Sequence, residues 1–149
     1  MEAVIFVGIQ GTGKSTFYKE RFFDTHIRIN LDMLRTLHRE KVILDACLEA
    51  KQKFVVDKIN VTREQRARYI ERAKNYGFRV IGYYFNSSLK NALERNSRRE
   101  GNARIPDKGL IAALKRLEIP NLDEGFDELF YVWINEENSF VVENWKVEV

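Results

Sequence analysis

The segment from Gly8 to Thr16 constrains this chain more than any other part of it. Its residues, GIQGTGKST, match the phosphate-binding pattern G-x-x-x-x-G-K-[ST] at every fixed position and directly follow an apolar run. A loop can turn its backbone N–H groups onto a polyphosphate only where side chains are small and a positive φ costs little, which suits Gly8, Gly11 and Gly13. The sequence therefore predicts a site for a nucleoside triphosphate.

The second half of this loop carries the side chains that such a site needs. Lys14 is expected to reach the β- and γ-phosphates as a point charge, and the Ser15 hydroxyl is expected to ligate Mg²⁺. The helix that begins here adds the partial positive charge of its N-terminus. The expected donor is ATP with Mg²⁺, and the residues expected to bind it in this loop are Gly11, Thr12, Gly13, Lys14, Ser15 and Thr16.

Length and composition limit what the remainder can be. With 149 residues, of which 44% are hydrophobic, we expect a single domain over residues 1–149 with a real core. The net charge of +3 permits a polyanionic partner without specifying one. The single cysteine excludes an internal disulfide, and no apolar run reaches the ~18 residues of a membrane span. Because Met1 leads straight into a strand without a basic leader, we expect a cytoplasmic setting and no membrane partner. The oligomeric state stays open.

Short apolar runs alternate with helical patterns along the chain, which is typical of an α/β protein whose parallel sheet has helices on both faces. About five core strands are expected, over 3–7, 27–29, 54–56, 79–85 and 130–134. Helices are expected over about 14–22, near 31, and over 42–51, 62–76, 88–96 and 106–117. The helix after Thr62 has the clearest start, because Thr62 and Gln65 form a capping-box pattern. Residues 139–149 alternate well enough for one or two added edge strands.

Asp32 and Arg35 follow the second expected strand. Ligands of open α/β sheets bind beyond the carboxyl ends of the strands, so Asp32 should stand over the same crevice as the phosphate loop. A carboxylate there can accept the proton of an attacking hydroxyl, and Arg35, three residues on along one helix face, can hold an anionic acceptor beside it. The alternative is a structural pair, in which Asn30 or Asp32 caps a short helix.

Two further features lie downstream. Asp57 ends the third strand, where P-loop proteins carry an acidic residue near the magnesium site; there it holds a metal-bound water, orients Arg35, or simply marks the strand end. The basic connection 95–104 predicts a lid over about 98–105 whose arginine closes on the transferred phosphoryl group, although a solvated charge run is the alternative. The arginines at 63, 66 and 72 are expected on the solvated sides of helices, although a groove that follows a nucleic-acid backbone could use some of them.

The order of these motifs resembles the kinase module of polynucleotide 5′-hydroxyl kinases. The resemblance covers roughly residues 1–130 and rests on the phosphate loop, on NLDMLR from Asn30, on DKINVTREQRAR from Asp57, and on RNSRR in the lid. It implies a P-loop kinase fold, a three-layer sandwich with a short lid, and transfer of the γ-phosphate of ATP to the 5′-OH of DNA or RNA. It also implies roles for four residues: general base for Asp32, acceptor-phosphate contact for Arg35, donor-phosphate contact for Arg99, and an essential carboxylate at Asp57.

Departures from the family pattern leave two other functions open. Leu31 stands where the family often has an arginine, and the chain carries neither a phosphatase nor a ligase motif. A P-loop kinase acting on a small-molecule hydroxyl, such as that of a nucleoside, sugar or antibiotic, would share the loop and the acidic base. A nucleotide-binding regulatory module without transfer chemistry is the third possibility.

Overall fold

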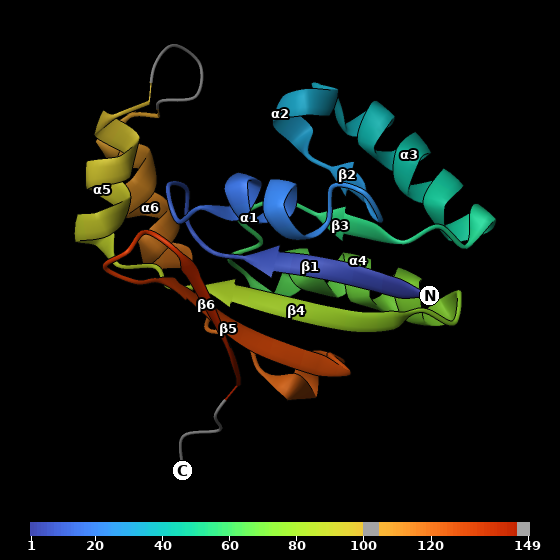
Figure 1. The fold of residues 1–149 in the computed structure, drawn as a ribbon. Helices are drawn as coiled ribbons and strands as arrows, with labels where there is room; N and C mark the ends of the chain where they lie inside the picture. Colours follow the sequence, from blue (N-terminus) through green and yellow to red (C-terminus); the bar gives the residue numbers. More distant parts are fainter. Residues whose placement is uncertain (100–104, 146–149) are drawn as a thin grey trace.

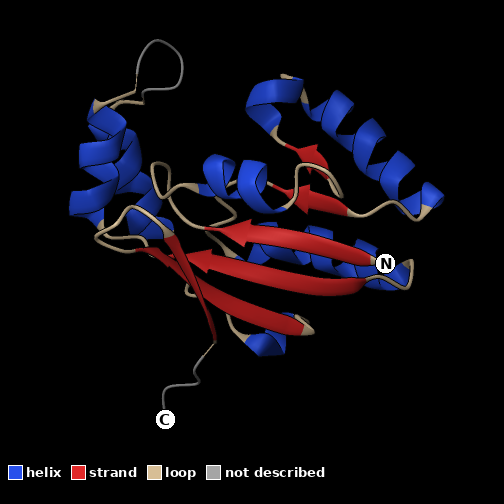
Figure 2. Ribbon diagram, in the orientation of Figure 1, coloured by secondary structure: helices blue, strands red, loops and turns tan. Residues whose placement is uncertain are grey.

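Six strands form one sheet in the order β2-β3-β1-β4-β5-β6 (Figures 1 and 2). The structure is a computed structural model and describes residues 1–99 and 105–145. The first five strands run parallel, and the sixth pairs antiparallel with the fifth. The strands are β1 (Glu2–Val7), β2 (Ile27–Ile29), β3 (Phe54–Val56), β4 (Arg79–Phe85), β5 (Glu128–Ile134) and β6 (Phe140–Asn144).

Helices cover both faces of this sheet, which confirms the α/β prediction and its three layers. The elements are α1 (Lys14–Arg21), α2 (Leu31–Leu34), α3 (Leu37–Ala50), α4 (Arg63–Asn75), α5 (Leu89–Ser97), α6 (Asp107–Arg116) and the 3₁₀ helix η2 (Leu122–Glu124). In Figure 1, α1 lies in front of the sheet and α4 behind it, while α5 and α6 stand together beyond the end of β1. Among the described residues, no helix is both long and apolar enough to cross a lipid bilayer.

The side chains of β1 show how the two faces are filled. Ala3, Ile5 and Val7 belong to the cluster formed with α3 and α4, whereas Val4 and Phe6 alternate onto the α1 side. All five are fully buried, as expected for a central parallel strand. Because β1 is fixed on both faces, the loop that follows it starts from a rigid point.

One helix begins earlier than expected, and the C-terminal extension forms an edge strand as expected. The helix expected from residue 42 begins at Leu37, because the Thr36 side chain accepts a hydrogen bond from the backbone N–H of Arg39 (3.1 Å) and so caps a polar first turn. The C-terminal extension forms β6, antiparallel to β5 in the register Trp133 with Val141. Residues 146–149 of that extension and 100–104 of the expected lid lie outside the described residues.

Arg66 corrects the expectation of a solvated helix side. Its side chain is completely buried and donates twice to the Glu124 carboxylate of η2, at 2.7 and 3.1 Å. It also donates to the backbone O of Asn60 (2.9 Å), so that each end of the guanidinium has a partner. A buried charge is tolerated on these terms only. The family-like stretch from Asp57 to Arg66 thus contains a structural anchor for α4.

Candidate functional site

The phosphate loop leaves β1 and is held open by its backbone conformation. Gly11 and Gly13 have φ of 79° and 93°, in the left-handed region that favours glycine. A Cβ on Gly11 would lie 2.8 Å from the backbone O of Ala92 in α5, so the space also requires glycine. The Thr12 hydroxyl donates to the backbone O of Ile9 (2.9 Å) and braces the turn. The loop is therefore shaped by its own residues and by the neighbouring helix.

Lys14 opens α1 and is almost fully buried. Its ammonium donates to the backbone oxygens of Gly8 (2.9 Å) and Ile9 (2.7 Å), which hold it along the loop. Burial lowers the pKa of Lys14 to about 8; the negative charge of Asp57 opposes this shift, and the positive charge of Arg99 adds to it. An incoming polyphosphate offers this ammonium stronger partners than backbone carbonyls do.

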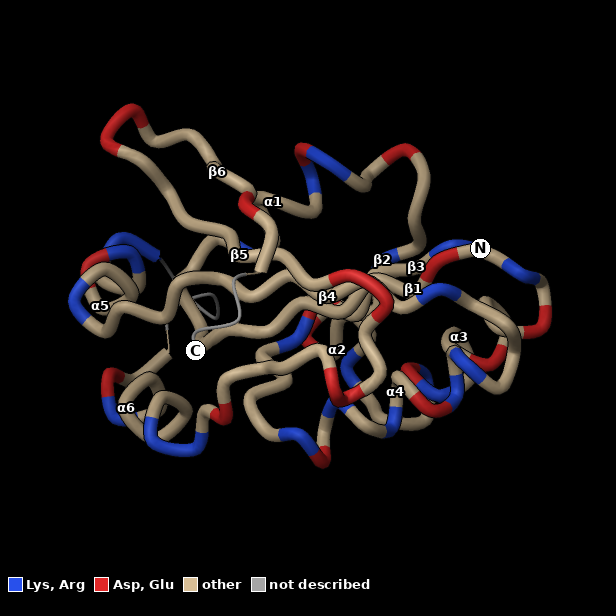
Figure 3. The backbone as a smooth tube through the Cα atoms, turned by 90° about the horizontal axis from the view of Figure 1, so that it is seen from below, with Lys and Arg blue, Asp and Glu red and all other residues tan. Residues whose placement is uncertain are grey.

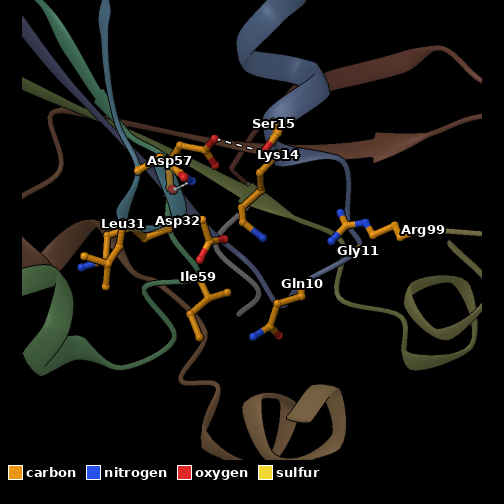
Figure 4. Close-up of a pocket in the computed structure, with 11 residues that line it drawn as sticks. Gln10, Gly11, Lys14, Ser15, Leu31, Asp32, Asp57, Ile59 and Arg99 are labelled. Carbon is orange, nitrogen blue, oxygen red and sulfur yellow. Dashed lines mark hydrogen bonds between the residues drawn. The ribbon is translucent and has the colours of Figure 1, made fainter. Parts of the chain in front are cut away.

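A cavity of about 230 Å³ lies beside the loop, at the carboxyl ends of β1, β2 and β3. In Figure 4, the side chains of Lys14, Asp32 and Arg99 extend toward the same space from three different segments. The lining residues are Gln10, Gly11, Lys14, Ser15, Asn30, Leu31, Asp32, Asp57, Lys58, Ile59 and Arg99. The loop, Asp32, Asp57 and Arg99, predicted separately from the sequence, meet at this cavity.

Arg35 is placed differently from the sequence expectation. The helix α2 is a single turn that ends at Leu34, and Arg35 follows with φ 76° and ψ −36°. Because Arg35 lies after the end of α2, it does not share a helix face with Asp32. Arg35 is exposed and is not among the described residues that line the cavity. The cap of α2 is Asn30, whose side chain accepts from the N–H of Met33 (3.0 Å) and donates to the backbone O of Asp57 (2.8 Å). Asp32 is thus not needed as the cap.

Asp57 and Ser15 are joined by a residue that sequence reasoning missed. The Ser15 hydroxyl donates to Asp57 Oδ2 (3.2 Å), and Arg28 Nε donates to the same carboxylate oxygen (2.8 Å). Arg28 Nη2 also donates to Ser15 Oγ (2.9 Å). The Ile-Arg-Ile alternation of β2 is the signal available in the sequence, since it turns Arg28 away from the face that carries buried Ile29.

A second cavity of about 120 Å³ adjoins the first, with Lys58 and Ile59 in the walls of both. Asn60, Gln65, Arg68 and Tyr69 complete its lining. Lys58 donates to both carboxylate oxygens of buried Glu40 (3.2 Å each) and to the Tyr69 hydroxyl (2.8 Å). The Tyr69 hydroxyl in turn donates to Glu40, and burial together with this carboxylate raises the pKa of Tyr69. The second cavity therefore has a fixed polar wall.

Comparison with known proteins places this chain in a family. A family model described as an AAA domain matches residues 34–120, more than half of the chain. The chain belongs to this AAA-domain family. The matched residues include Asp57 and Arg99, whereas Lys14 and Asp32 lie before the match.

Over 132 residues the chain is 27% identical to the bifunctional polynucleotide phosphatase/kinase of Schizosaccharomyces pombe. That similarity covers 84% of this chain and 32% of the relative, so the chain spans about a third of the relative's length.

Solved structures show the same fold. Chaetomium thermophilum Kti12, crystallised in complex with ADP-AlF3, matches with a TM-score of 0.65 at 18% identity, covering 91% of this chain and 92% of Kti12. A sugar kinase from Janibacter sp. HTCC2649 matches at 0.65 and 21% identity, covering 88% and 85%. AvrRxo1-ORF1:-ORF2 with ATP matches at 0.69 and 12% identity, covering 95% and 57%. This AAA-domain chain therefore has the P-loop kinase fold.

Proposed function

We propose that this protein is an ATP-dependent polynucleotide 5′-hydroxyl kinase. The observation that carries the proposal is the convergence of the Lys14 ammonium and the Asp32 carboxylate on one cavity, with Arg99 in the same wall (Figure 4). Phosphoryl transfer needs cations at the donor and a carboxylate at the acceptor hydroxyl, and the cavity offers both.

On the donor side, the loop supplies N–H groups and Lys14 supplies the charge. The ammonium leaves the carbonyls of Gly8 and Ile9 for the β- and γ-phosphates of ATP. Arg99 follows α5 and takes the charge that spreads over the γ-phosphoryl oxygens during transfer. Both side chains act by position and charge, which is most of what a protein contributes to this reaction.

Ser15 and Asp57 fit a magnesium site. Their hydroxyl and carboxylate oxygens are the hard ligands that Mg²⁺ prefers, and Mg²⁺ usually combines one or two protein ligands with substrate phosphates and water. A bound ion would neutralise negative charge on the phosphates of the nucleotide. Among residues 1–99 and 105–145 no group of three or more His, Cys, Asp or Glu side chains is arranged to hold a metal. In the proposed site, phosphate oxygens and water would supply the remaining ligands.

On the acceptor side, Asp32 serves as the general base. Its carboxylate accepts the proton of the 5′-hydroxyl while that oxygen forms a bond to the γ-phosphorus. The bond between the γ-phosphorus and the β–γ bridging oxygen breaks, and ADP leaves with the bridging oxygen. Asp32 is exposed and lines the cavity, so the 5′-hydroxyl end of an acceptor can reach its carboxylate.

Two observations support a nucleic acid as the acceptor. One is the similarity to the fission-yeast polynucleotide phosphatase/kinase. The other is the adjoining cavity with Arg68 in its wall, which gives room and positive charge for the phosphate that follows the 5′-terminal nucleoside. Acidic and basic residues are interspersed on α3 and α4 (Figure 3), so the proposed contact is local rather than a broad basic surface.

A kinase that acts on a small-molecule hydroxyl is the second candidate. It is favoured by the position of Arg35, which the polynucleotide kinase resemblance assigns to the acceptor's phosphate and which does not line the described cavity. A small acceptor needs no such contact.

An acceptor screen with ATP labelled in the γ-phosphate separates the candidates. The acceptors are single-stranded DNA and RNA oligonucleotides with 5′-hydroxyl ends, nucleoside 3′-phosphates, and free nucleosides and sugars. We expect label on the oligonucleotides, with the Lys14→Met variant as the inactive control. Transfer to free nucleosides or sugars alone supports the second candidate, and ATP binding without transfer to any acceptor supports a regulatory module.

A further inference from the structure

Arg28 contacts the two side chains that fit a magnesium ion. Its Nη2 donates to Ser15 Oγ (2.9 Å) and its Nε donates to Asp57 Oδ2 (2.8 Å). The Ser15 hydroxyl donates its proton to Asp57, and Arg28 uses one of the two lone pairs of the hydroxyl oxygen. A divalent cation bound to the same hydroxyl and carboxylate would lie beside the guanidinium, and the two positive charges would repel each other.

The geometry of strands β2 and β3 places Arg28 beside Asp57. Arg28 pairs in register with Val55 of β3, and Asp57 lies two residues beyond Val55, so both side chains turn toward the α1 side of the sheet. The guanidinium lies 5.8 Å from the ring centre of Tyr18 in α1, in a cation–π contact. The Tyr18 hydroxyl is itself tied to the backbone O of His26 (2.6 Å), which fixes the ring.

Exposure separates the two partners. The Asp57 side chain is 2% exposed and the Arg28 side chain 22% exposed. A buried carboxylate needs a cation, and Arg28 supplies it without a metal. Because the guanidinium reaches solvent, it can leave Asp57 without disturbing the core.

We infer that Arg28 is a built-in cation that competes with Mg²⁺ for Ser15 and Asp57 and supports nucleotide binding when the metal is absent. The inference rests on the nucleotide site of the proposed function. Arg28 is a positioning residue here, since it acts through Ser15 and Asp57. Its consequence is that the dependence of nucleotide affinity on Mg²⁺ is small in this protein and grows when Arg28 is neutralised.

The test compares ADP affinity, measured by titration calorimetry, in EDTA and in excess Mg²⁺. In Arg28→Gln we expect about a tenfold loss of affinity in EDTA, because the negative charge of Asp57 in the cavity wall is then no longer balanced by Arg28. We expect no loss in Mg²⁺, because the metal then balances that charge without competition from the guanidinium. Arg28→Lys keeps the charge and should retain metal-free binding better than Arg28→Gln. Lys19→Gln, an exposed charge loss on α1, is the matched control and should change neither value. Equal losses in both buffers, or no change in either, overturn the inference.

Thermal unfolding supplies a readout without nucleotide. Arg28→Gln leaves Asp57 unpaired, so Mg²⁺ alone should raise the Tm of this variant more than that of the wild type. An equal Mg²⁺ effect on both proteins contradicts the competition. Transfer assays keep the two proposals apart: normal ADP binding with no transfer to any acceptor overturns the proposed kinase function and leaves the role of Arg28 standing.

Discussion

Arg66 and Glu124, 58 residues apart in the sequence, form a two-pronged ion pair with Nε–Oε1 and Nη2–Oε2 distances of 2.7 and 3.1 Å. The Arg66 side chain is 0% exposed and that of Glu124 4%. The pair joins α4 to η2, and Arg66 also contacts the backbone of Asn60 in the segment between Asp57 and α4. It links the stability of the fold to the placement of the cavity wall.

We expect Arg66→Met to lower the free energy of unfolding by about 3–5 kcal/mol, because buried Glu124 is left with only Arg63, 4.0 Å away, as a cationic neighbour. Urea denaturation measures the change. The double variant Arg66→Met with Glu124→Leu should recover part of the loss, since neither charge is then unpaired. Additive losses in this double-mutant cycle contradict the pair.

Replacing Asp32 should separate chemistry from binding. We expect Asp32→Asn to lower kcat for 5′-phosphorylation by roughly 10²–10⁴-fold, the usual contribution of a general base, while ATP affinity stays close to that of the wild type. Initial rates with a 5′-hydroxyl oligonucleotide and a separate ATP titration measure the two effects. Asp24→Asn, an exposed aspartate before β2, is the control. A wild-type rate in Asp32→Asn rules out this base.

Arg98 and Arg99 form a matched pair at the end of α5. Arg99 lines the cavity, whereas Arg98 is 72% exposed and pairs with Glu94 at 2.6 Å. We expect Arg99→Gln to lower kcat by about 10²–10³-fold, since it removes a cation from the transferred phosphoryl group, and Arg98→Gln to leave kcat nearly unchanged. Single-turnover rates at saturating ATP make the comparison. Equal effects of the two substitutions assign no special role to Arg99.

The pH dependence of stability should carry a contribution from His26. Burial lowers the pKa of His26, and the hydrogen bond and charge of Glu2, whose Oε1 lies 2.8 Å from His26 Nε2, only partly offset it. Lys53 is the other charged group that acts on the ring. With a folded pKa below the unfolded value of about 6.5, the unfolded chain binds more protons, so stability falls as the pH drops below that value.

Thermal melts between pH 7 and pH 5 measure this contribution. We expect the Tm of the wild type to fall across the interval and that of His26→Gln to fall less, because the variant has no ring to protonate on unfolding. His38→Gln, an exposed histidine at the start of α3, is the control and should follow the wild type. A steeper fall in His26→Gln than in the wild type contradicts the sign of the pKa shift.

Local patterns accounted for the features that sequence predicted well. The phosphate loop needs glycines at fixed spacing, and the capping box of α4 needs only Thr62 and Gln65, which form both of its hydrogen bonds, at 3.1 and 3.3 Å. The alternation of apolar runs and helical patterns likewise indicated a parallel sheet of about five strands, and the first five strands are parallel. Each of these signals lies within a few residues of the structure it describes.

The features that sequence did not predict depend on distant partners. Arg28 meets Ser15 and Asp57 across separations of 13 and 29 residues, and nothing adjacent to it in the sequence marks the encounter. Arg66 has a solvent-like pattern on its helix, and only the arrival of η2 makes its burial possible. Arg35 missed the cavity because α2 ends after one turn, a boundary that depends on the φ of a single residue.

The antiparallel strand β6 has a consequence for the opposite end of the chain. Its first residue, Phe140, packs edge-on against Phe17 of α1, with ring centres 5.1 Å apart, and a Cβ on Gly13 would lie 3.0 Å from the Phe140 ring. The phosphate loop is therefore clamped from outside by a residue more than 120 positions later in the sequence. Shortening the chain before Phe140 removes that clamp, and the damage would be measured as lost nucleotide affinity before it was measured as lost fold.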